Sequence, residues 1–154
     1  LMAPPSPPSS FGETVLIHAA AGGVGTAVVQ LAKAAGKRVV GVVDTPEKVR
    51  FALSQGADAA VDYRGDVAQA VKEATAGRGV DLLLDPVGGT GTARNFDLLA
   101  PFGMLISFGE LEGLPQGDLF DAIRRKPMRS LALRHFTMHT LDARPELRAP
   151  LRRQ

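Results

Sequence analysis

The chain has 154 residues, which is enough for one domain with its own hydrophobic core. Apolar residues make up 45% of it, aromatic residues only 5%, and cysteine is absent. This composition excludes a disulfide framework, a thiol nucleophile and zinc bound by cysteine, and it argues against intrinsic disorder. No apolar run has the length of a membrane span, so we expect a cytoplasmic protein with no membrane contact.

The net charge of +2 is unevenly distributed along the chain. Lys and Arg set against Asp and Glu give 9 − 13 = −4 over residues 1–120 and 9 − 3 = +6 over residues 121–154. Such a basic segment could bind nucleic acid. Aromatic side chains do not alternate with the arginines as a stacking platform would require, so the pattern favours a solvated helix face or a contact with another lobe.

The alternation of short apolar runs with Ala-rich stretches predicts the fold class. Residues 1–11 are rich in Pro and Ser and predict a linker or lead-in segment, whereas residues 12–154 predict one domain. Strands are expected over 14–18, 39–43, 59–62, 80–85 and 104–107, with a sixth over 130–134. Helices are expected over 24–35, 46–55, 66–76, 93–99 and 119–125, with a last one over 146–153. Strands in this rhythm indicate an α/β fold, doubly wound around a parallel sheet with helices on both faces.

The turn after the first predicted strand reads AAGGVG over residues 20–25, a variant of the glycine fingerprint of dinucleotide-binding domains. A small residue at Ala20 permits the tight turn, Gly22 lets the backbone approach a pyrophosphate, and Gly25 lets the following helix pack closely on the strand. The N-terminus of that helix offers free N–H groups and the positive end of its dipole to phosphates. The turn therefore predicts a dinucleotide site, although a flavodoxin-like domain could use the same glycines for packing alone.

Further residues support the dinucleotide site and exclude other sites. Asp44 lies 19 residues after Gly25, just past the second predicted strand, where an acid can accept hydrogen bonds from the adenosine ribose. No G-K-[ST] follows the glycines, which excludes a phosphate-loop nucleotidase. The single tyrosine, Tyr63, has no Lys four residues later, which disfavours the short-chain dehydrogenases, and no G-x-S-x-G elbow is present.

Four blocks of the sequence resemble, in order and spacing, the quinone-oxidoreductase (zeta-crystallin-like) branch of the medium-chain dehydrogenase/reductase superfamily. They are GETVLIHAAAGGVGTAVVQLAKAAGKRVVGVV over 12–43, EKVRFALSQGADAAVDYR over 47–64, GRGVDLLLDPVGG over 77–89 and LAPFGMLISFG over 99–109. From residue 110 onward the similarity is general. The resemblance implies a six-stranded Rossmann sheet in the order 3-2-1-4-5-6, and zinc-independent reduction of quinones or other α,β-unsaturated carbonyls by hydride transfer from NAD(P)H.

The resemblance also implies where the cofactor binds, although it identifies no catalytic residue. Lys48 and Tyr63 match positions that hold the adenosine 2′-phosphate in NADPH-using members, and a lysine suits a phosphate. Pro86 stands where relatives often have Ser, which leaves one hydrogen bond to the cofactor unassigned. The positions expected to bind the cofactor, with the last two near the nicotinamide, are Ala20, Ala21, Gly22, Gly23, Val24, Gly25, Asp44, Lys48, Tyr63, Asp85, Pro86, Val87, Gly88, Phe108 and Gly109.

The residues give mixed signals on the choice between the two nicotinamide cofactors. Asp44 would repel a 2′-phosphate and favours NADH, whereas Lys48 and Tyr63 favour NADPH. Asp44 lies one residue beyond the acid of NAD-dependent relatives, and neighbouring strand residues face opposite ways, so its side chain need not reach the ribose. We therefore expect NADPH, with NADH as the alternative.

The substrate lobe of such enzymes comes from sequence on both sides of the Rossmann domain, and this chain carries neither part. We therefore expect an excised or truncated cofactor domain that catalyses little alone and meets its small-molecule substrate only with the missing lobe. The edge of the sixth strand, which pairs with its twin in family dimers, predicts a homodimer. Two alternatives are an enoyl-reductase segment of a multidomain synthase and a non-catalytic module that binds a nucleotide, RNA or a protein.

Several polar residues also have a purely structural interpretation. His18 follows the first strand, where a packed, hydrogen-bonded histidine is favoured over a cofactor contact. Asp85 could cap the turn after its strand, and Tyr63 could be structural. His135 and His139 lie four residues apart, but a strand and loop without a third ligand does not predict a metal site.

Overall fold

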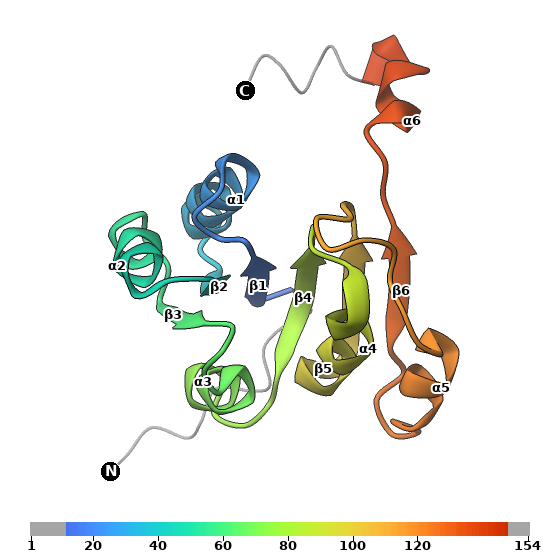
Figure 1. Cartoon of the computed structure of the whole chain (residues 1–154), viewed down its shortest axis with the longest axis horizontal. Helices are drawn as coiled ribbons and strands as arrows, with labels where there is room; N and C mark the ends of the chain where they lie inside the picture. The colour runs from blue at the N-terminus through green and yellow to red at the C-terminus, as the bar shows by residue number, and fades with distance from the viewer. Residues whose placement is uncertain (1–11, 148–154) are drawn as a thin grey trace.

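The computed structural model describes residues 12–147 of the chain, and a parallel β-sheet runs through its centre (Figure 1). Across these residues the sheet has six strands: β1 Thr14–His18, β2 Arg38–Val43, β3 Ala59–Asp62, β4 Val80–Asp85, β5 Leu99–Ser107 and β6 Ala132–His135. Their order is β3-β2-β1-β4-β5-β6, and every neighbouring pair is parallel. The predicted α/β fold and the strand order implied by the resemblance are both confirmed.

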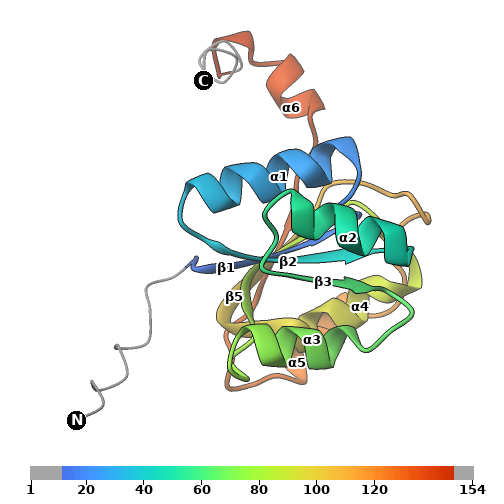
Figure 2. The same cartoon turned by 90° about the vertical axis from the view of Figure 1, so that its left-hand side faces the viewer.

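Helices cover both faces of the sheet, as expected (Figure 2). The helices are α1 Gly23–Ala34, α2 Pro46–Ser54, α3 Val67–Ala74, α4 Thr92–Asn95, α5 Leu119–Arg124 and α6 His139–Asp142, with 3-10 turns η1 Gly89–Gly91 and η2 Phe96–Leu98 around α4. Figure 2 shows α1 and α2 on one face and α3, α4 and α5 on the other, while α6 stands apart from the sheet. None of the helices within residues 12–147 combines the length and the apolar character that a bilayer crossing requires.

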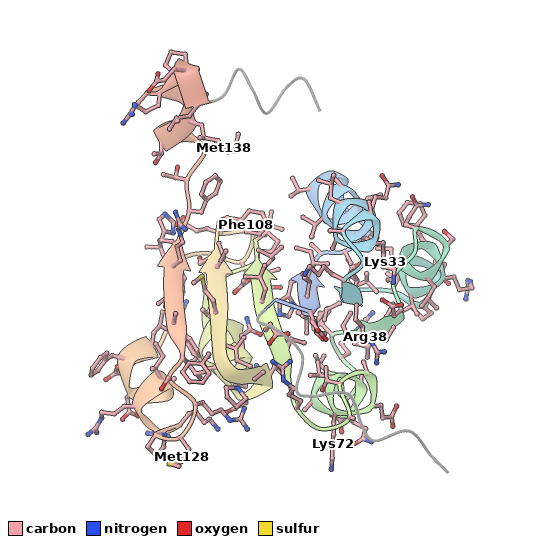
Figure 3. All side chains as sticks on the ribbon, turned by 180° about the vertical axis from the view of Figure 1, so that it is seen from behind. Lys33, Arg38, Lys72, Phe108, Met128 and Met138 are labelled. Carbon is pink, nitrogen blue, oxygen red and sulfur yellow. The ribbon has the colours of Figure 1, made fainter. Side chains whose placement is uncertain are left out.

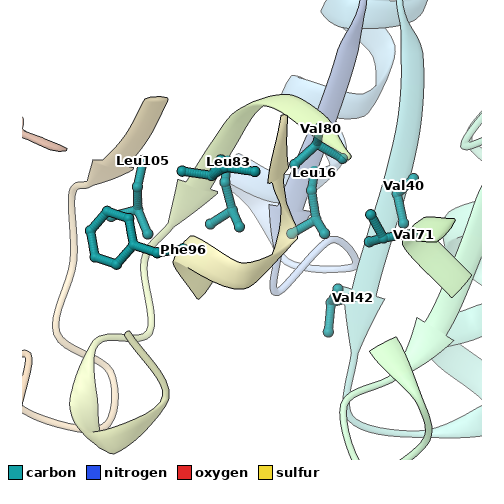
Figure 4. Packing of buried hydrophobic residues seen from close by; sticks show 9 residues of the cluster. Leu16, Val40, Val42, Val71, Val80, Leu83, Phe96 and Leu105 are labelled. Atoms are coloured by element: carbon teal, nitrogen blue, oxygen red, sulfur yellow. The ribbon is translucent and has the colours of Figure 1, made fainter. Parts of the chain in front are cut away.

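Two apolar clusters join the helices to the sheet, one on each face. On the face of α3 and α4, buried residues of the strands, among them Leu16 and Leu83, surround Phe96 and Val71 (Figure 4). On the opposite face, Ile17 packs with residues of α1 and α2. Consecutive residues of one strand thus point into different clusters, which is why the strands read as continuous apolar runs rather than as alternating ones.

The chain reverses its direction of travel across the sheet at β1. Val15 of β1 pairs on one side with Val39 of β2 and on the other with Leu82 of β4. The connections to β2 and to β4 therefore leave β1 in opposite directions, and a crevice opens between them at the carboxyl ends of the strands. In open α/β sheets this is the position at which ligands bind.

The structure moves several expected boundaries in the second half of the chain. Strand β5 begins at Leu99, five residues before the expected start, because Leu99 pairs with Val80 ahead of a register irregularity. The helix expected over 93–99 is therefore shorter and divides into α4 and η2. Strand β6 begins at Ala132 rather than at Ser130, whose positive φ of 51° belongs to a turn.

The two ends of the sequence carry expectations that the structure does not test. The expected linker over 1–11 lies outside the described residues. Most of the helix expected over 146–153 lies outside them too, although residues 145–147 are helical.

Candidate functional site

A cavity of ≈ 890 Å³ lies at the carboxyl ends of β1, β2 and β4, where the order of the strands reverses. Many of the residues that line it are expected cofactor positions. Those that line it are Ala21, Gly22, Asp44, Lys48, Tyr63, Asp85, Val87 and Gly88. The fold thus brings residues from distant parts of the sequence together around one space large enough for a nucleotide.

The glycine turn forms one wall of the cavity, between β1 and α1. Gly22 is the N-cap of α1 and its N–H donates to Ala19 O at 2.9 Å, with no side chain capping the helix. A Cβ on Gly25 would lie 2.2 Å from Ala19 O, so no larger residue fits where the helix crosses the strand end. The expected role of Gly25 in close packing agrees with this distance. The uncapped N-terminus leaves backbone N–H groups of the first helical turn available to an anion.

Charged side chains gather at the end of the cavity next to β2. Lys48 Nζ lies 2.8 Å from Asp44 Oδ1, and this hydrogen bond holds the pKa of Asp44 below its usual value. Tyr63 is exposed, and the guanidinium carbon of Arg64 lies 5.5 Å from the centre of its ring. Arg64 also donates to Asp62 Oδ2 at 2.9 Å. Two cations, a phenol and two carboxylates therefore stand close together at this end.

Asp85 is buried at the end of β4 and organises the wall opposite the glycine turn. Its Oδ1 accepts from the backbone N–H of Val87 at 2.8 Å and of Gly88 at 3.2 Å, which is the expected cap of the turn. Its Oδ2 accepts from Asn95 Nδ2 at 3.2 Å and from Thr92 Oγ1 at 3.4 Å. The carboxylate therefore has four donors and ties the β4 turn to α4.

His18 lies on the floor between these walls and lines the cavity. Its Nε2 is 3.0 Å from Asn95 Oδ1, so the expected hydrogen bond of a packed histidine is present. Burial lowers the pKa of His18, and the opposing effects of Asp85 and of the hydrogen bond to Asn95 do not cancel this shift. The imidazole is therefore mainly neutral at pH 7.

Other expected cofactor positions do not line the cavity. They are Ala20, Gly23, Val24 and Gly25 around the glycine turn, and Pro86, Phe108 and Gly109 at the ends of β4 and β5. Ala20 is fully buried beneath the turn, in the cluster of α1 and α2. Phe108 lies at the carboxyl ends of the strands (Figure 3), and a Cβ on Gly109 would lie 2.6 Å from Pro86 O. The cavity therefore covers only part of the crevice.

Sequence reasoning missed several side chains that stand at the cavity. Arg94 and Asn95 line it from α4, and Arg64 flanks Tyr63. The spacing of the polar Thr92 and Asn95, three residues apart on one helix face, did not signal this role, because only the structure shows that both are buried. Buried polar groups need partners, which is what Asp85 supplies.

The basic residues of the last segment are largely paired within the described chain. Arg125 Nη2 lies 2.6 Å from Asp121 Oδ2, and Arg124 lies 3.6 Å from the other oxygen of the same carboxylate. Lys126 forms an ion pair with Asp97. Arg124, the last residue of α5, and Arg125 after it remain exposed, in agreement with a solvated helix face.

The comparison with known families agrees with this geometry. The sequence model of the family described as zinc-binding dehydrogenase matches residues 23–149. The chain belongs to this family. Its relatives also confirm the resemblance to the quinone-oxidoreductase branch of the medium-chain superfamily.

Individual relatives show how much of such a protein the chain represents. It is 45% identical to the quinone oxidoreductase of Pseudomonas aeruginosa over 103 residues, covering 66% of this chain and 32% of the relative. The structure of the Escherichia coli quinone oxidoreductase complexed with NADPH is 34% identical with a TM-score of 0.77, covering 84% of this chain and 40% of that one. A solved candidate enoyl reductase domain of a polyketide synthase is 30% identical with a TM-score of 0.76, covering 94% and 79%. The chain spans about a third of the length of the curated relatives that it matches.

The residues of this chain do not fit the zinc in the family's description. The sequence has no cysteine, and residues 12–147 contain no group of three or more His, Asp or Glu side chains that could hold a metal ion. His139 opens the short helix α6 instead of lying in the expected loop, and its Nδ1 is 3.8 Å from Asp142 Oδ2. We derive no chemistry of this chain from zinc.

Proposed function

We propose that this chain is the NADPH-binding domain of an oxidoreductase that reduces quinones or other α,β-unsaturated carbonyls. The observation that carries the proposal is the cavity at the sheet's reversal point, with the glycine turn on one side and Lys48 beside Tyr63 on another. The NADPH in the complexed Escherichia coli quinone oxidoreductase supports the same cofactor here. When bound, NADPH supplies the hydride that reduces the substrate.

The chain's own residues bind and orient the cofactor. The glycine turn and the uncapped start of α1 take the pyrophosphate, because backbone N–H groups and the helix dipole favour an anion there. Lys48 and Tyr63 take the 2′-phosphate. Asp85, Val87 and Gly88 bound the opposite wall, and Phe108 with Gly109 lies toward the nicotinamide. The substrate site is formed with parts of the whole enzyme that this chain does not include.

Asp44 sets the discrimination between the two cofactors. It already forms an ion pair with Lys48 at 2.8 Å, so an arriving 2′-phosphate competes with a carboxylate for the same ammonium group. We expect NADPH to win because a phosphate carries more charge than a carboxylate and accepts hydrogen bonds from Tyr63 as well. The preference for NADPH over NADH is then smaller than it would be without Asp44.

Calorimetric titration with NADPH and NADH tests the proposal. Loss of a charge-assisted hydrogen bond predicts that Lys48→Ala weakens NADPH binding by roughly ten- to a hundredfold while NADH binding changes little. Arg50→Ala is the matched control, since Arg50 lies on the same helix, pairs with Glu47 and does not line the cavity. Tighter binding of NADH than of NADPH would instead make Asp44 the ribose anchor, and Asp44→Asn would then weaken NADH binding.

The edge of the sheet supports a further part of the proposal, a homodimer. Strand β6 is hydrogen-bonded to β5 on one side, and its residues from Leu133 to His135 are exposed. An exposed edge offers unpaired backbone groups to a second strand. We propose that two copies of β6 pair there, and a monomer in equilibrium sedimentation would contradict this.

An enoyl-reductase segment of a multidomain synthase is the second candidate, because the chain covers 79% of a candidate polyketide synthase reductase domain. It would use the same cofactor and the same cavity. Assays of the whole protein with a quinone and with an enoyl thioester separate the two. Nucleic-acid binding is less favoured, because Arg124, Arg125 and Lys126 already have carboxylate partners.

A further inference from the structure

His18 is held by a chain of hydrogen bonds that starts at a carboxylate. Asp85 Oδ2 accepts from Asn95 Nδ2 at 3.2 Å, and Asn95 Oδ1 faces His18 Nε2 at 3.0 Å. The histidine and the asparagine are 77 residues apart in the sequence. Both are anchored in regular elements, β1 and α4, so their relative position is fixed by the fold.

This chain of hydrogen bonds fixes the tautomer of the imidazole. A carboxylate only accepts, and Asp85 already receives two backbone N–H groups at its other oxygen, so Asn95 must turn its amide nitrogen toward Asp85. The amide oxygen of Asn95 then faces His18 and requires a donor. In the neutral ring that donor is Nε2–H, which leaves Nδ1 as a bare acceptor.

The ring of His18 is partly accessible and lines the cavity. Within residues 12–147, the ring of His18 forms one hydrogen bond, from Nε2 to Asn95, and Nδ1 forms none. Every fully enclosed side-chain nitrogen or oxygen of those residues has a partner, so Nδ1 is not sealed in the core. Because His18 lines the cavity, a ligand there can donate a hydrogen bond to Nδ1.

The cavity favours one half of the dinucleotide as the donor. His18 shares it with Asp44 and Lys48, the residues at the adenosine end, whereas Phe108 and Gly109, toward the nicotinamide, do not line it. The donors of the adenosine half of NADPH are the 3′-hydroxyl of the ribose, whose 2′-oxygen carries the phosphate, and the adenine amino group. Phosphate oxygens are acceptors and do not suit a bare nitrogen.

We infer that His18 is a cofactor-binding residue, held by Asp85 and Asn95 as the Nε2–H tautomer so that Nδ1 accepts a hydrogen bond from the adenosine half of NADPH. This inference rests on the proposed function. It gives Asn95 a positioning role, because the asparagine acts on the cofactor only through the orientation and tautomer of the histidine.

The tautomer is tested by nitrogen NMR of the full chain with labelled histidine. The three histidines are assigned with His18→Gln and His139→Gln. We expect the free protein at neutral pH to show His18 protonated at Nε2 and bare at Nδ1. On saturation with NADPH or with adenosine 2′,5′-bisphosphate, the Nδ1 resonance moves toward the protonated position, and nicotinamide mononucleotide leaves it unchanged. A proton on Nδ1 in the free protein, or an Nδ1 resonance that does not shift when NADPH is added, overturns the inference.

Binding affinity gives the second measurement. Gln at position 18 keeps an N–H donor for Asn95, but its amide oxygen is one bond farther from the backbone than Nδ1, so no acceptor remains at the Nδ1 position. His18→Gln therefore weakens NADPH binding by about three- to tenfold, as one lost neutral hydrogen bond predicts. His139→Gln is the matched control, since that side chain is 91% exposed and lies outside the cavity. Equal affinities of the two variants would overturn the inference and leave the proposed function standing. Absence of NADPH binding by the wild type would overturn both.

The positioning role and the identity of the donor are separable. Asn95→Leu keeps the branching at Cγ but has no amide oxygen, so His18 loses its fixed tautomer, and a mixture of the two tautomers appears in the nitrogen spectrum. A pure Nε2–H tautomer in this variant would contradict the role of Asn95. The analogue with hypoxanthine in place of adenine lacks the amino group, so a retained Nδ1 shift assigns the donor to the ribose and a lost one assigns it to adenine.

Discussion

Asp81 is a charged residue whose position was not predicted from the sequence, although it joins the starts of two central strands. It is 7% exposed, and its Oδ2 accepts from the backbone N–H of Glu13 and of Thr14, each at 3.0 Å. Arg78 completes the site, with Nη2 2.5 Å from Oδ1. Nothing in the run VDLLLD distinguishes a buried aspartate from an exposed one, because the partners come from β1 as well as from the preceding turn.

We predict that Asp81→Asn lowers the free energy of unfolding by about 1–3 kcal/mol at neutral pH, because a buried donor set loses its charged acceptor. Burial alone would raise the pKa of Asp81, but the hydrogen bonds from Arg78 and the backbone hold it below its ordinary value. The unfolded chain therefore takes up this proton at a higher pH than the folded chain does. The difference in the free energy of unfolding between wild type and variant has its full size above about pH 4. It shrinks as the pH falls toward the lower pKa of the folded state.

Urea unfolding followed from pH 7 to pH 3 measures this difference. Asp66→Asn is a suitable control, because Asp66 is an exposed N-cap of α3 and asparagine caps a helix about as well. A wild-type to Asp81→Asn gap that stays constant across this pH range would show that the ionised carboxylate is not the stabilising form.

At the scale of elements, the contact between α1 and the end of β1 depends on a single missing methyl group. An added Cβ at Gly25 would lie 2.2 Å from Ala19 O and 2.7 Å from Ala20 Cα, and both atoms are backbone. A backbone clash cannot be relieved by a rotamer change. We predict that Gly25→Ala lowers the free energy of unfolding by roughly 3 kcal/mol, the upper end of the overpacking range, and distorts the turn that forms the cavity wall.

Gly23→Ala is the matched control for Gly25→Ala, because an added Cβ at Gly23 meets nothing within 4 Å. Alanine is the better helix former, so the free energy of unfolding of this variant should be unchanged or higher by up to about 1 kcal/mol. Chemical unfolding of the two variants side by side tests the packing argument. Similar stabilities would mean that α1 moves away from β1 at little cost.

The sequence predicted elements well where a buried strand has unambiguous neighbours. The bounds of β1, β3 and β4 are as expected, because each is an apolar run with turn or helix signals on both sides. It failed at β5, where Leu99 and Ala100 are as compatible with a helix as with a strand. There, pairing with Val80 decides the conformation, and the local sequence does not indicate a pairing with a residue 19 positions earlier.

At the scale of the whole molecule, the site was predictable only in part. The glycine turn and Lys48 belong to recognisable sequence patterns, so the order of the strands was enough to place them at one crevice. The link from His18 to Asn95 spans 77 residues and involves no motif, and it could be found only once β1 and α4 were placed side by side. The Asp44–Lys48 ion pair likewise depends on side-chain directions that periodicity does not give.

Because of the position of the cavity, binding of the cofactor should raise the free energy of unfolding of the whole chain. The walls of the cavity come from β1, β2, β4 and α4, so a ligand there binds the folded chain and not the unfolded one. NADPH at a hundred times its dissociation constant should add about 2.7 kcal/mol to the free energy of unfolding. For a chain of this length that corresponds to a rise of roughly 5–10 °C in the unfolding midpoint, measurable by calorimetry.

The same sample should show no quinone-dependent oxidation of NADPH, because the chain spans about a third of the length of its relatives and the hydride acceptor needs walls that the sheet alone does not provide. An unmoved midpoint at saturating NADPH would contradict the assignment of the cavity. Steady NADPH consumption by the isolated chain would instead mean that the carboxyl edge of the sheet, beside Phe108, already holds the acceptor unaided. A raised midpoint without turnover is the combination that a cofactor domain requires.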